Sequence, residues 1–389
     1  MKKVLFLAIG MFALGFDAYI IAGLVPGISE TYDKSASQVG QAVSIFTLFY
    51  AISAPLFASI LAGKPIKKIL LISIVIFGLA NALSAVAPNF SIFLISRAIA
   101  GIGAGLFSPL AVAGSTLLVP AEKKGRALSL TIGGMSMGTV LGVPIGLYLA
   151  NIFNWQFAMW VIVILSCIAA ISILKYLPNV SASAPPAIKE RLAMFIDKRV
   201  TVTVLITFFA SIASLGLYTY LSPLLQDLNS TKDITVYLWS WGLGGLVGSV
   251  LIGYLIDYFK KPKALMLMIL VILTVSIICI PLMINVPIVK YLPFFIWGAM
   301  GWAAQAPQQH ILLSYQPKQG STAVALNSSI NYLGSAVGAT MGGVVISVGM
   351  GTMSLIYFAL FAMGISLSLQ FYSMKNNFGM IKANRVLDK

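Results

Sequence analysis

The sequence predicts an all-α membrane protein whose twelve transmembrane helices form two pseudo-symmetric six-helix bundles, with both termini in the cytoplasm. Of its 389 residues, 59% are hydrophobic and only 9% are charged. The mean hydropathy of +0.97 lies far above that of a soluble domain. The apolar runs are long and continuous rather than alternating, and a bilayer core needs about 20 apolar residues per helical span. They therefore predict helices rather than the strands of a membrane barrel.

Twelve apolar runs are the candidate spans. They cover residues 4–26, 38–62, 69–87, 91–118, 126–150, 154–175, 201–224, 234–258, 264–284, 288–313, 320–348 and 352–373. The first run resembles a secretory signal peptide, because Met1, Lys2 and Lys3 precede it. However, it is longer than a signal peptide's apolar region, contains Asp17 and lacks a small-residue cleavage site, so we assign it as the first span.

The basic residues support this count and set the orientation. Lysine and arginine accumulate in short loops on the cytoplasmic side of a membrane. With the N-terminus inside, all but four of the 25 lysines and arginines fall in cytoplasmic loops or tails; Lys34, Lys232 and Lys290 fall outside, and Arg97 lies within a span. The net charge of +15 therefore reflects multi-pass topology in an inner (plasma) membrane, and we expect no nucleic-acid partner.

The longest cytoplasmic stretch divides the chain into two bundles. Residues 176–200 form a linker with three prolines and an amphipathic segment, IKERLAMFIDKR, that suits a membrane interface. The linker separates an N-terminal bundle (1–175) from a C-terminal bundle (201–373), and a cytoplasmic tail (374–389) follows.

The two bundles are predicted to be copies, because several residues recur 196 positions later. These residues are Gly138, Gly142 and Gly146, which correspond to Gly334, Gly338 and Gly342, and Lys64, which corresponds to Lys260. Glycine at every fourth position also provides a helix packing face, but packing alone does not require a shared offset. Two parallel six-helix repeats are typical of a rocking transporter with its site near the midplane.

Several motifs resemble those of the major facilitator superfamily, in particular its twelve-helix drug:proton antiporter and small-metabolite efflux branch. The fourth span carries RAIAGIGAG (97–105), which resembles the family's arginine-containing motif. The fifth span carries GTVLGVPIG (138–146), which resembles the antiporter signature G-x-x-x-G-P-x-x-G, with Val143 before Pro144. Further segments similar to that branch are 41–56, 217–225, 297–309 and 325–343.

One motif departs from the family pattern. The loop after the second span usually reads G-x-x-x-D-R-x-G-R-K, whereas this chain has GKPIKK (63–68), with basic residues but no acid. The copy after the eighth span, GYLIDYFKKPK (253–263), keeps Asp257. In the family this loop latches the cytoplasmic ends of the two halves. The resemblance therefore carries gating over to Asp257 only, and it assigns gating or packing to Lys260, Pro144 and the glycines above.

Asp17 and Arg97 are the ionisable residues that lie well away from the ends of their spans, whereas Asp257 and His310 lie near cytoplasmic ends. Asp17 precedes Pro26 by about 13 Å of helix, and Arg97 follows the outer end of its span by about 9 Å. These depths differ by less than a helical turn. The two side chains are predicted to pair if their helices adjoin, as they do in the resembled fold.

Three interpretations of Asp17 remain open. In the first, Asp17 and Arg97 form a permanent structural ion pair. In the second, which we favour, Asp17 carries a proton: burial favours the protonated carboxyl, and a guanidinium that never loses its own proton favours the ionised one. In the third, Asp17 binds a cationic substrate directly. The second half has Ala213 at the corresponding position, so this acid was not duplicated.

A substrate cavity is predicted from polar and aromatic residues on the spans that line the pore in the resembled fold. The candidates are Gln41, Tyr50, Tyr218, Tyr220, Trp241, Gln305, Gln309, Asn327 and Asn331, with Tyr19 and Trp302 as weaker ones. Each could equally be an interhelical hydrogen-bonding residue or part of an interfacial belt. Such a lining suits neutral or weakly cationic, partly apolar organic molecules.

We therefore expect a monomeric, proton-coupled secondary transporter that exports small organic compounds by alternating access, with protons and the bilayer as its other partners. The alternatives are a sugar or nucleobase exporter or importer and, less favoured, a non-transporting receptor. An enzyme is disfavoured, because one histidine and one deep acid do not assemble a catalytic group. Cys167 and Cys279 lie in apolar runs and His310 has no partner pattern, so neither a metal site nor a cofactor is expected.

Overall fold

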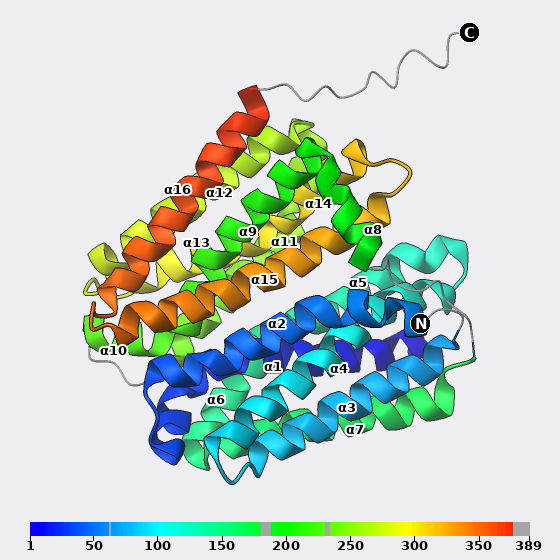
Figure 1. Cartoon of the computed structure of the whole chain (residues 1–389), viewed down its shortest axis with the longest axis horizontal. Coiled ribbons are helices and arrows are strands. Elements are labelled where there is room, and N and C mark those ends of the chain that lie inside the picture. Colours follow the sequence, from blue (N-terminus) through cyan, green and yellow to red (C-terminus); the bar gives the residue numbers. More distant parts are fainter. Residues whose placement is uncertain (62–63, 180–187, 230–233, 376–389) are drawn as a thin grey trace.

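A computed structural model describes residues 1–61, 64–179, 188–229 and 234–375, and within these ranges the chain is helical, without β-strands (Figure 1). Eleven helices in these ranges are long and apolar enough to cross a membrane. The prediction of an all-α membrane protein is therefore confirmed, and the ends of most spans lie within a few residues of those read from the sequence.

The first bundle is built from six spans. They are α1 (Lys2–Tyr32), α2 (Ala36–Leu61), α3 (Ile66–Ala85), α4 (Phe90–Leu117), a fifth span made of α5 (Lys124–Met137), the π-helical segment η2 (Gly138–Gly142) and α6 (Val143–Ile152), and α7 (Trp155–Tyr176). The first span is longer than predicted. It continues through Pro26 and ends where Asp33 adopts a left-handed conformation, with φ of 49°.

The linker and the second bundle follow. Their elements are α8 (Ile188–Ala193), η3 (Met194–Ile196), α9 (Lys198–Thr219), α10 (Leu221–Asn229), α11 (Thr235–Phe259), α12 (Pro262–Met283), α13 (Leu292–Ala303), α14 (Gln305–Tyr315), α15 (Gly320–Ser347) and α16 (Met353–Lys375). The predicted tenth span is two helices, α13 and α14. Ala304 between them has helical dihedrals and donates its N–H to the Met300 carbonyl at 3.0 Å, so the pair still forms one crossing.

The two bundles lie side by side, with α2 and α15 along the boundary between them (Figure 1). Twelve crossings return the chain to the side on which α1 begins, which we call the terminal side. The other side, where α1 ends and α10 lies, is called the far side.

The predicted repeat is visible in the packing of the glycines. Gly138 lies against Phe12 and Phe16 of α1, and a Cβ there would come within 2.8 Å of the Phe12 carbonyl carbon. Gly334 lies against Phe208 of α9, where a Cβ would be 2.6 Å from the carbonyl oxygen. Phe208 is also 196 positions after Phe12, so each glycine meets the equivalent backbone in its own half. These glycines act as predicted in packing, because only glycine permits so close an approach.

Candidate functional site

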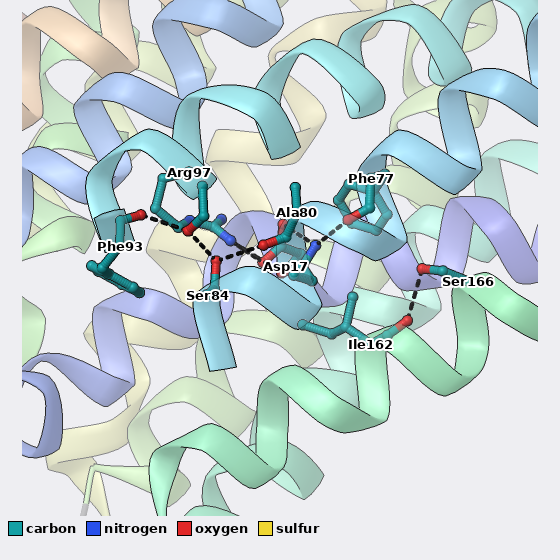
Figure 2. Close-up of polar contacts among 10 residues, drawn as sticks. Asp17, Phe77, Ala80, Ser84, Phe93, Arg97, Ile162 and Ser166 are labelled. Carbon is teal, nitrogen blue, oxygen red and sulfur yellow. Dashed lines mark hydrogen bonds and ion pairs between the residues drawn. The ribbon is translucent and has the colours of Figure 1, made fainter. Parts of the chain in front are cut away.

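A charged cluster lies inside the first bundle, where α1, α3 and α4 meet. Arg97 Nη1 donates to Asp17 Oδ1 at 2.9 Å and to Asn81 Oδ1 at 3.1 Å. The Asn81 amide nitrogen lies 3.4 Å from Asp17 Oδ2 and donates to the Phe77 carbonyl. Figure 2 shows Arg97 reaching Asp17 from the neighbouring helix. The predicted contact between Asp17 and Arg97 is therefore present, with Asn81 as a bridge.

This cluster is closed off from its surroundings. The Asp17 and Arg97 side chains are 0% and 1% exposed, and Asn81 is buried as well. The Arg97 guanidinium lies 4.7 Å from the centroid of the Phe46 ring, and its Nε has no hydrogen-bond partner among the described residues. Burying a charge pair is costly unless its remaining polar atoms are satisfied. The amide of Asn81 satisfies part of that requirement, and Nε is left as an unpaired donor.

The glycines of the fourth span explain why Arg97 can reach its partners. Gly101 lies directly against the Phe46 carbonyl of α2, and a Cβ at Gly103 would lie 2.8 Å from the Ser73 carbonyl oxygen of α3. Larger residues would hold α4 away from both neighbours. The RAIAGIGAG motif therefore supplies both the cation and the close helix contacts that position it.

A cavity of about 400 Å³ lies between the two bundles. Its walls come from α1 and α5 of the first bundle and from α9, α11, α12, α13, α14 and α15 of the second. Four predicted residues line it: Trp241, Gln305, Gln309 and Asn331. Asn331 Oδ1 accepts from Ser211 Oγ at 2.6 Å and from Gln305 Nε2 at 3.1 Å, so this part of the wall is fixed by hydrogen bonds.

The other five predicted substrate residues do not line this cavity, because each is engaged elsewhere or enclosed by neighbouring helices. Gln41 Nε2 donates to the Ser37 carbonyl, Tyr50 stacks on Tyr332, Tyr218 OH donates to the Tyr19 carbonyl, Tyr220 OH donates to the Ala339 carbonyl, and Asn327 is buried. Sequence reasoning could place these residues on pore-lining spans, but it could not tell which face of each helix meets a neighbour.

Several functional candidates were missed by the sequence predictions. Gln308 and Thr207 line the cavity, and the weaker candidates Tyr19 and Trp302 line it too. Gln308 lies three residues after Gln305 and so shares its helix face, a spacing that was a usable signal. Asn81 also had a signal, since an amide within an apolar span usually finds a polar partner.

An aromatic layer spans the boundary between the bundles beside the cavity. Tyr19 of α1 contacts the rings of Tyr218, Trp241 and Trp302 from the second bundle, at centroid distances of 5.5, 5.4 and 6.3 Å. Tyr50 and Tyr332 meet across the same boundary at 3.9 Å. On the far side of this layer, Ser37 Oγ donates to the Gly343 carbonyl at 2.6 Å, joining α2 to α15. The two bundles are therefore in contact on the far side.

Most of the remaining residues predicted to act in gating or packing lie at helix contacts or helix ends. Gly142 and Gly146 pack on Phe16, Gly338 packs on Ile212 and Gly216, and Gly342 packs on Tyr220. Pro144 lies at the start of α6 and is buried. Lys260 ends α11 in a left-handed conformation, with φ of 50°, and is exposed. The Asp257 side chain lies outside the part of the chain that the structure describes.

Comparison with known proteins identifies the family. The family model of the Major Facilitator Superfamily matches residues 7–339, and the chain therefore belongs to this superfamily. The crystal structure of a D-xylose-proton symporter superposes with a TM-score of 0.76 over 94% of this chain and 96% of that one, at 19% identity. The fold is thus that of a membrane transporter with two six-helix halves.

Individual relatives are more distant. The inner membrane transport protein YdhP of Escherichia coli (strain K12) is 29% identical over 375 residues, which is 95% of each chain. A chloramphenicol resistance protein of Streptomyces lividans is 27% identical over 303 residues, 76% of this chain and 77% of its own. A probable sugar efflux transporter of Mannheimia succiniciproducens is 26% identical over 344 residues, 87% and 86% of the two chains. These similarities place the chain among multi-span transporters of the plasma membrane.

Proposed function

We propose that this protein exports small organic compounds in exchange for protons, by alternating access of its two bundles, with the proton gradient as its energy source and no cofactor. The observation that carries the proposal is the buried Asp17–Arg97 pair; the second bundle has Ala213 at the position that corresponds to Asp17. An intramembrane carboxylate is by default a functional-site hypothesis. The similarity to a chloramphenicol resistance protein and to a probable sugar efflux transporter favours export.

In this mechanism Asp17 is the proton carrier and Arg97 is the fixed cation. The Arg97 guanidinium stabilises the ionised carboxylate and so favours release of the proton. When Asp17 is protonated the ion pair is weakened, and Arg97 Nη1 retains the Asn81 Oδ1 acceptor at 3.1 Å. Asn81 thus limits the cost of leaving Arg97 without an ionised partner. Because the three residues lie on α1, α3 and α4, a change at Asp17 alters how these helices pack.

The geometry disfavours direct binding of a cationic substrate by Asp17. Tyr19 faces the cavity, and Asp17 lies two residues earlier on α1. Two residues turn a helix by about 200°, which places the carboxylate on the opposite face. Asp17 is fully buried within the first bundle, so a solute in the cavity meets Tyr19 instead.

The test is transport by purified protein in proteoliposomes with an imposed pH gradient. Asp17→Asn is expected to lose gradient-driven accumulation of substrate and to keep exchange without a gradient, because the amide cannot carry a proton. Asp33→Asn is the matched control, because Asp33 is an exposed residue at the C-terminal end of the same helix. This variant should behave like the parent. Uphill transport that survives in Asp17→Asn would contradict the proton-carrier role and leave a structural ion pair.

A sugar substrate is the second candidate, supported by the similarity to the sugar efflux transporter and by the amide-rich cavity wall of Gln305, Gln309 and Asn331. Amides suit hydroxyl-rich ligands because they offer donors and acceptors together. Competition for one labelled substrate by monosaccharides and by chloramphenicol distinguishes the two candidates.

A further inference from the structure

The residues that the structure describes in the cavity wall include no charged side chain. Among the residues that line it, the polar ones are serine, threonine, tyrosine, tryptophan, asparagine and glutamine, and none is aspartate, glutamate, lysine, arginine or histidine. A charged solute that leaves water for such a site loses its hydration without gaining a counter-ion, which is strongly unfavourable. Asp17, two residues before the wall residue Tyr19, belongs to the cluster inside the first bundle, on the other face of α1.

The wall does hold polar atoms without partners. Both side-chain amide atoms of Gln308, the Thr207 hydroxyl and the Trp241 indole Nε1 are buried and make no hydrogen bond within the described structure. Native proteins leave few such groups, because an unsatisfied buried polar atom is destabilising. These three residues lie on α14, α9 and α11, so they surround one space from three helices of the second bundle.

We propose that this cavity binds an uncharged organic molecule that carries both hydrogen-bond donors and acceptors, and that Gln308, assisted by Thr207 and Trp241, recognises it. This assignment rests on the proposed transport function and names its substrate class. The first bundle contributes Tyr19, Ile132, Met135 and Ser136 to the same space, which offers aromatic and apolar contact to the rest of the molecule. Proton and solute therefore bind at separate places, the proton inside the first bundle and the solute in the cavity between the bundles.

The proposal has an electrical consequence. If one carboxylate, Asp17, carries one proton inward while one uncharged molecule moves outward, each cycle transfers one net positive charge. The membrane potential then drives transport as well as the pH gradient, with about 2.3 kcal/mol per charge for each 100 mV. Exchange of a proton for a monovalent cation would instead be electrically silent.

The binding test uses three related probes with the purified full-length protein: uncharged chloramphenicol, its anionic hemisuccinate ester, and the cationic amine that remains when the dichloroacetyl group is removed. Chloramphenicol is expected to raise the melting temperature and the two ions are not, because the wall offers no counter-charge. A shift by either ion as large as that by chloramphenicol would overturn the assignment of an uncharged substrate. No shift by chloramphenicol would also count against it.

Variants test the residue assignment through both the stability of the unliganded protein and the binding of the probe. Gln308→Leu is expected to raise the melting temperature of the unliganded protein, since it removes two unsatisfied buried atoms, and to weaken probe binding by about tenfold, the effect of one lost hydrogen bond. Gln41→Leu, the same substitution outside the cavity, should leave binding unchanged. If Gln308→Leu destabilises the unliganded protein more than Gln41→Leu does, the Gln308 amide is structural and the assignment fails.

The electrical test separates this inference from the proposed function. With equal pH on both sides, a potassium diffusion potential of about 100 mV, negative inside, is expected to drive net movement of chloramphenicol out of the vesicles in the parent and not in Asp17→Asn. If a pH gradient drives transport and the potential does not, proton coupling stands and the uncharged-substrate inference fails. If neither gradient drives transport while chloramphenicol still binds, the coupling proposal fails and the substrate class stands.

A second, independent observation concerns the linker between the bundles. Arg191 of α8 is 5% exposed, although it lies outside the membrane-spanning helices. Its Nη1 donates to the Ala325 carbonyl at 2.9 Å and to Ser329 Oγ at 2.6 Å, both on α15. Ser329 Oγ in turn donates to the Ala51 carbonyl of α2 at 2.8 Å. Arg191 of the linker thus donates to the same Ser329 hydroxyl that joins α15 to α2.

The linker is also anchored by apolar contacts. Met194 and Phe195 of η3 pack in a cluster with Val200, Leu312 and Tyr315 of the second bundle. Burial lowers the pKa of Arg191 to about 10, which still leaves the guanidinium charged at neutral pH. A charged group held in this way is costly to release, because its hydrogen bonds must be broken in a poorly solvated place. The segment predicted to lie at the membrane interface therefore packs partly against α2 and α15.

We infer that Arg191 is a positioning residue that holds α2 against α15 through the linker and so stabilises the conformation described above. The loop after α2, GKPIKK, lacks the acid that would serve a latch there, and Arg191 provides a contact of this kind from a different segment. Separation of α2 from α15 requires the Ser329–Ala51 hydrogen bond to break, and Arg191 fixes the Ser329 hydroxyl that makes this bond by donating to it.

Distance measurements between spin labels test this role. Labels at Leu56 of α2 and Leu313 of α14, both exposed, are attached in a variant in which Cys167 and Cys279 are replaced by serine. Arg191→Ala is expected to broaden the distance distribution and shift it to longer values, Arg191→Lys to do so less, and the exposed neighbour variant Lys189→Ala to leave it unchanged. Unchanged distributions in both Arg191 variants would overturn the inference. A lowered melting temperature with unchanged distances would assign Arg191 a purely structural role.

Discussion

The two bundles have nearly the same backbone plan and very different polar interiors. Gly138 meets the Phe12 backbone in the first bundle as Gly334 meets the Phe208 backbone in the second. Yet the first bundle buries an ion pair among its own helices, whereas the second has the fully buried Ala213 at the position that corresponds to Asp17. Helix packing needs small residues at fixed positions, but it does not need charged ones. The two bundles therefore share a helix arrangement, whereas their polar side chains differ and can serve different functions.

The fifth and eleventh spans differ in helical geometry at matching positions, where the fifth has Pro144 and the eleventh has Thr340. The fifth span contains the π-helical segment Gly138–Gly142 immediately before Pro144, whereas α15 is an uninterrupted α-helix with Thr340 at the matching position. A proline within a helix lacks an N–H and clashes with the carbonyl four residues earlier. An extra residue in the turn widens the helix and relieves the clash. Thr139 in this wider turn contacts the Gly15 carbonyl, two residues before Asp17, with Oγ1 at 3.3 Å.

The largest expected effect is the loss of the cation from the first bundle. Arg97→Leu removes the cationic partner of the buried Asp17 carboxyl, so the free energy of unfolding should fall by about 3–5 kcal/mol. Adding Asp17→Asn to this variant should restore much of the loss, because no charge then remains buried. Thermal unfolding of the three variants in detergent measures both steps. A double variant no more stable than Arg97→Leu alone would show that packing, not charge, decides the stability here.

The difference between the fifth and eleventh spans predicts the next effect. Thr340→Pro places a proline in an α-helix that has no π-helical turn before it, and should cost about 3 kcal/mol or more in unfolding free energy. Thr340→Ala is the matched control and should cost little, since Thr340 is exposed and its hydroxyl bonds only the Ala336 carbonyl of the same helix. Thermal unfolding compares the two. Tolerance of proline at 340 would mean that both spans accept the widened turn.

Paired glycine variants test the shared packing plan. Gly138→Ala and Gly334→Ala should each destabilise the protein by about 1–3 kcal/mol, because the added methyl overpacks a backbone contact. Gly133→Ala on α5 has no atom near the new methyl and should be neutral or stabilising, by up to about 1 kcal/mol. Equal losses at 138 and 334 would support equivalent contacts. A loss at one position alone would show that the repeat has diverged in packing as well as in charge.

The smallest effect is expected at the start of the second bundle. Arg199 and Gln316 donate to Asp197, which lowers the pKa of this carboxyl below its usual value, with Arg199 as the main cause. Because the pKa is lower in the folded state, the ionised Asp197 carboxylate stabilises the fold at pH values above its unfolded pKa of about 3.9. This stabilisation is lost as the pH falls below that value. The contribution of such a partly exposed pair is at most about 1 kcal/mol.

Asp197→Asn isolates this term, because asparagine still caps α9. Between pH 6 and pH 3, the melting temperature of the parent should fall slightly more than that of Asp197→Asn. At pH 3 the melting temperatures of the two proteins should be nearly equal. Parallel pH profiles would indicate that Asp197 acts only as a helix cap.

The sequence alone determined the number and limits of the spans, the two-fold repeat and the likeness to a transporter family, because hydrophobic length, charge placement and glycine spacing are local properties. It also singled out Asp17 and Arg97, since a charge in an apolar helix is conspicuous in any context. Only the tertiary structure decided that Asn81 bridges them, that Gln308 and Thr207 line the cavity while Tyr220 and Asn327 do not, and that Arg191 reaches α15. These facts depend on which face of each helix meets which neighbour, and that rotation is set by packing between distant segments.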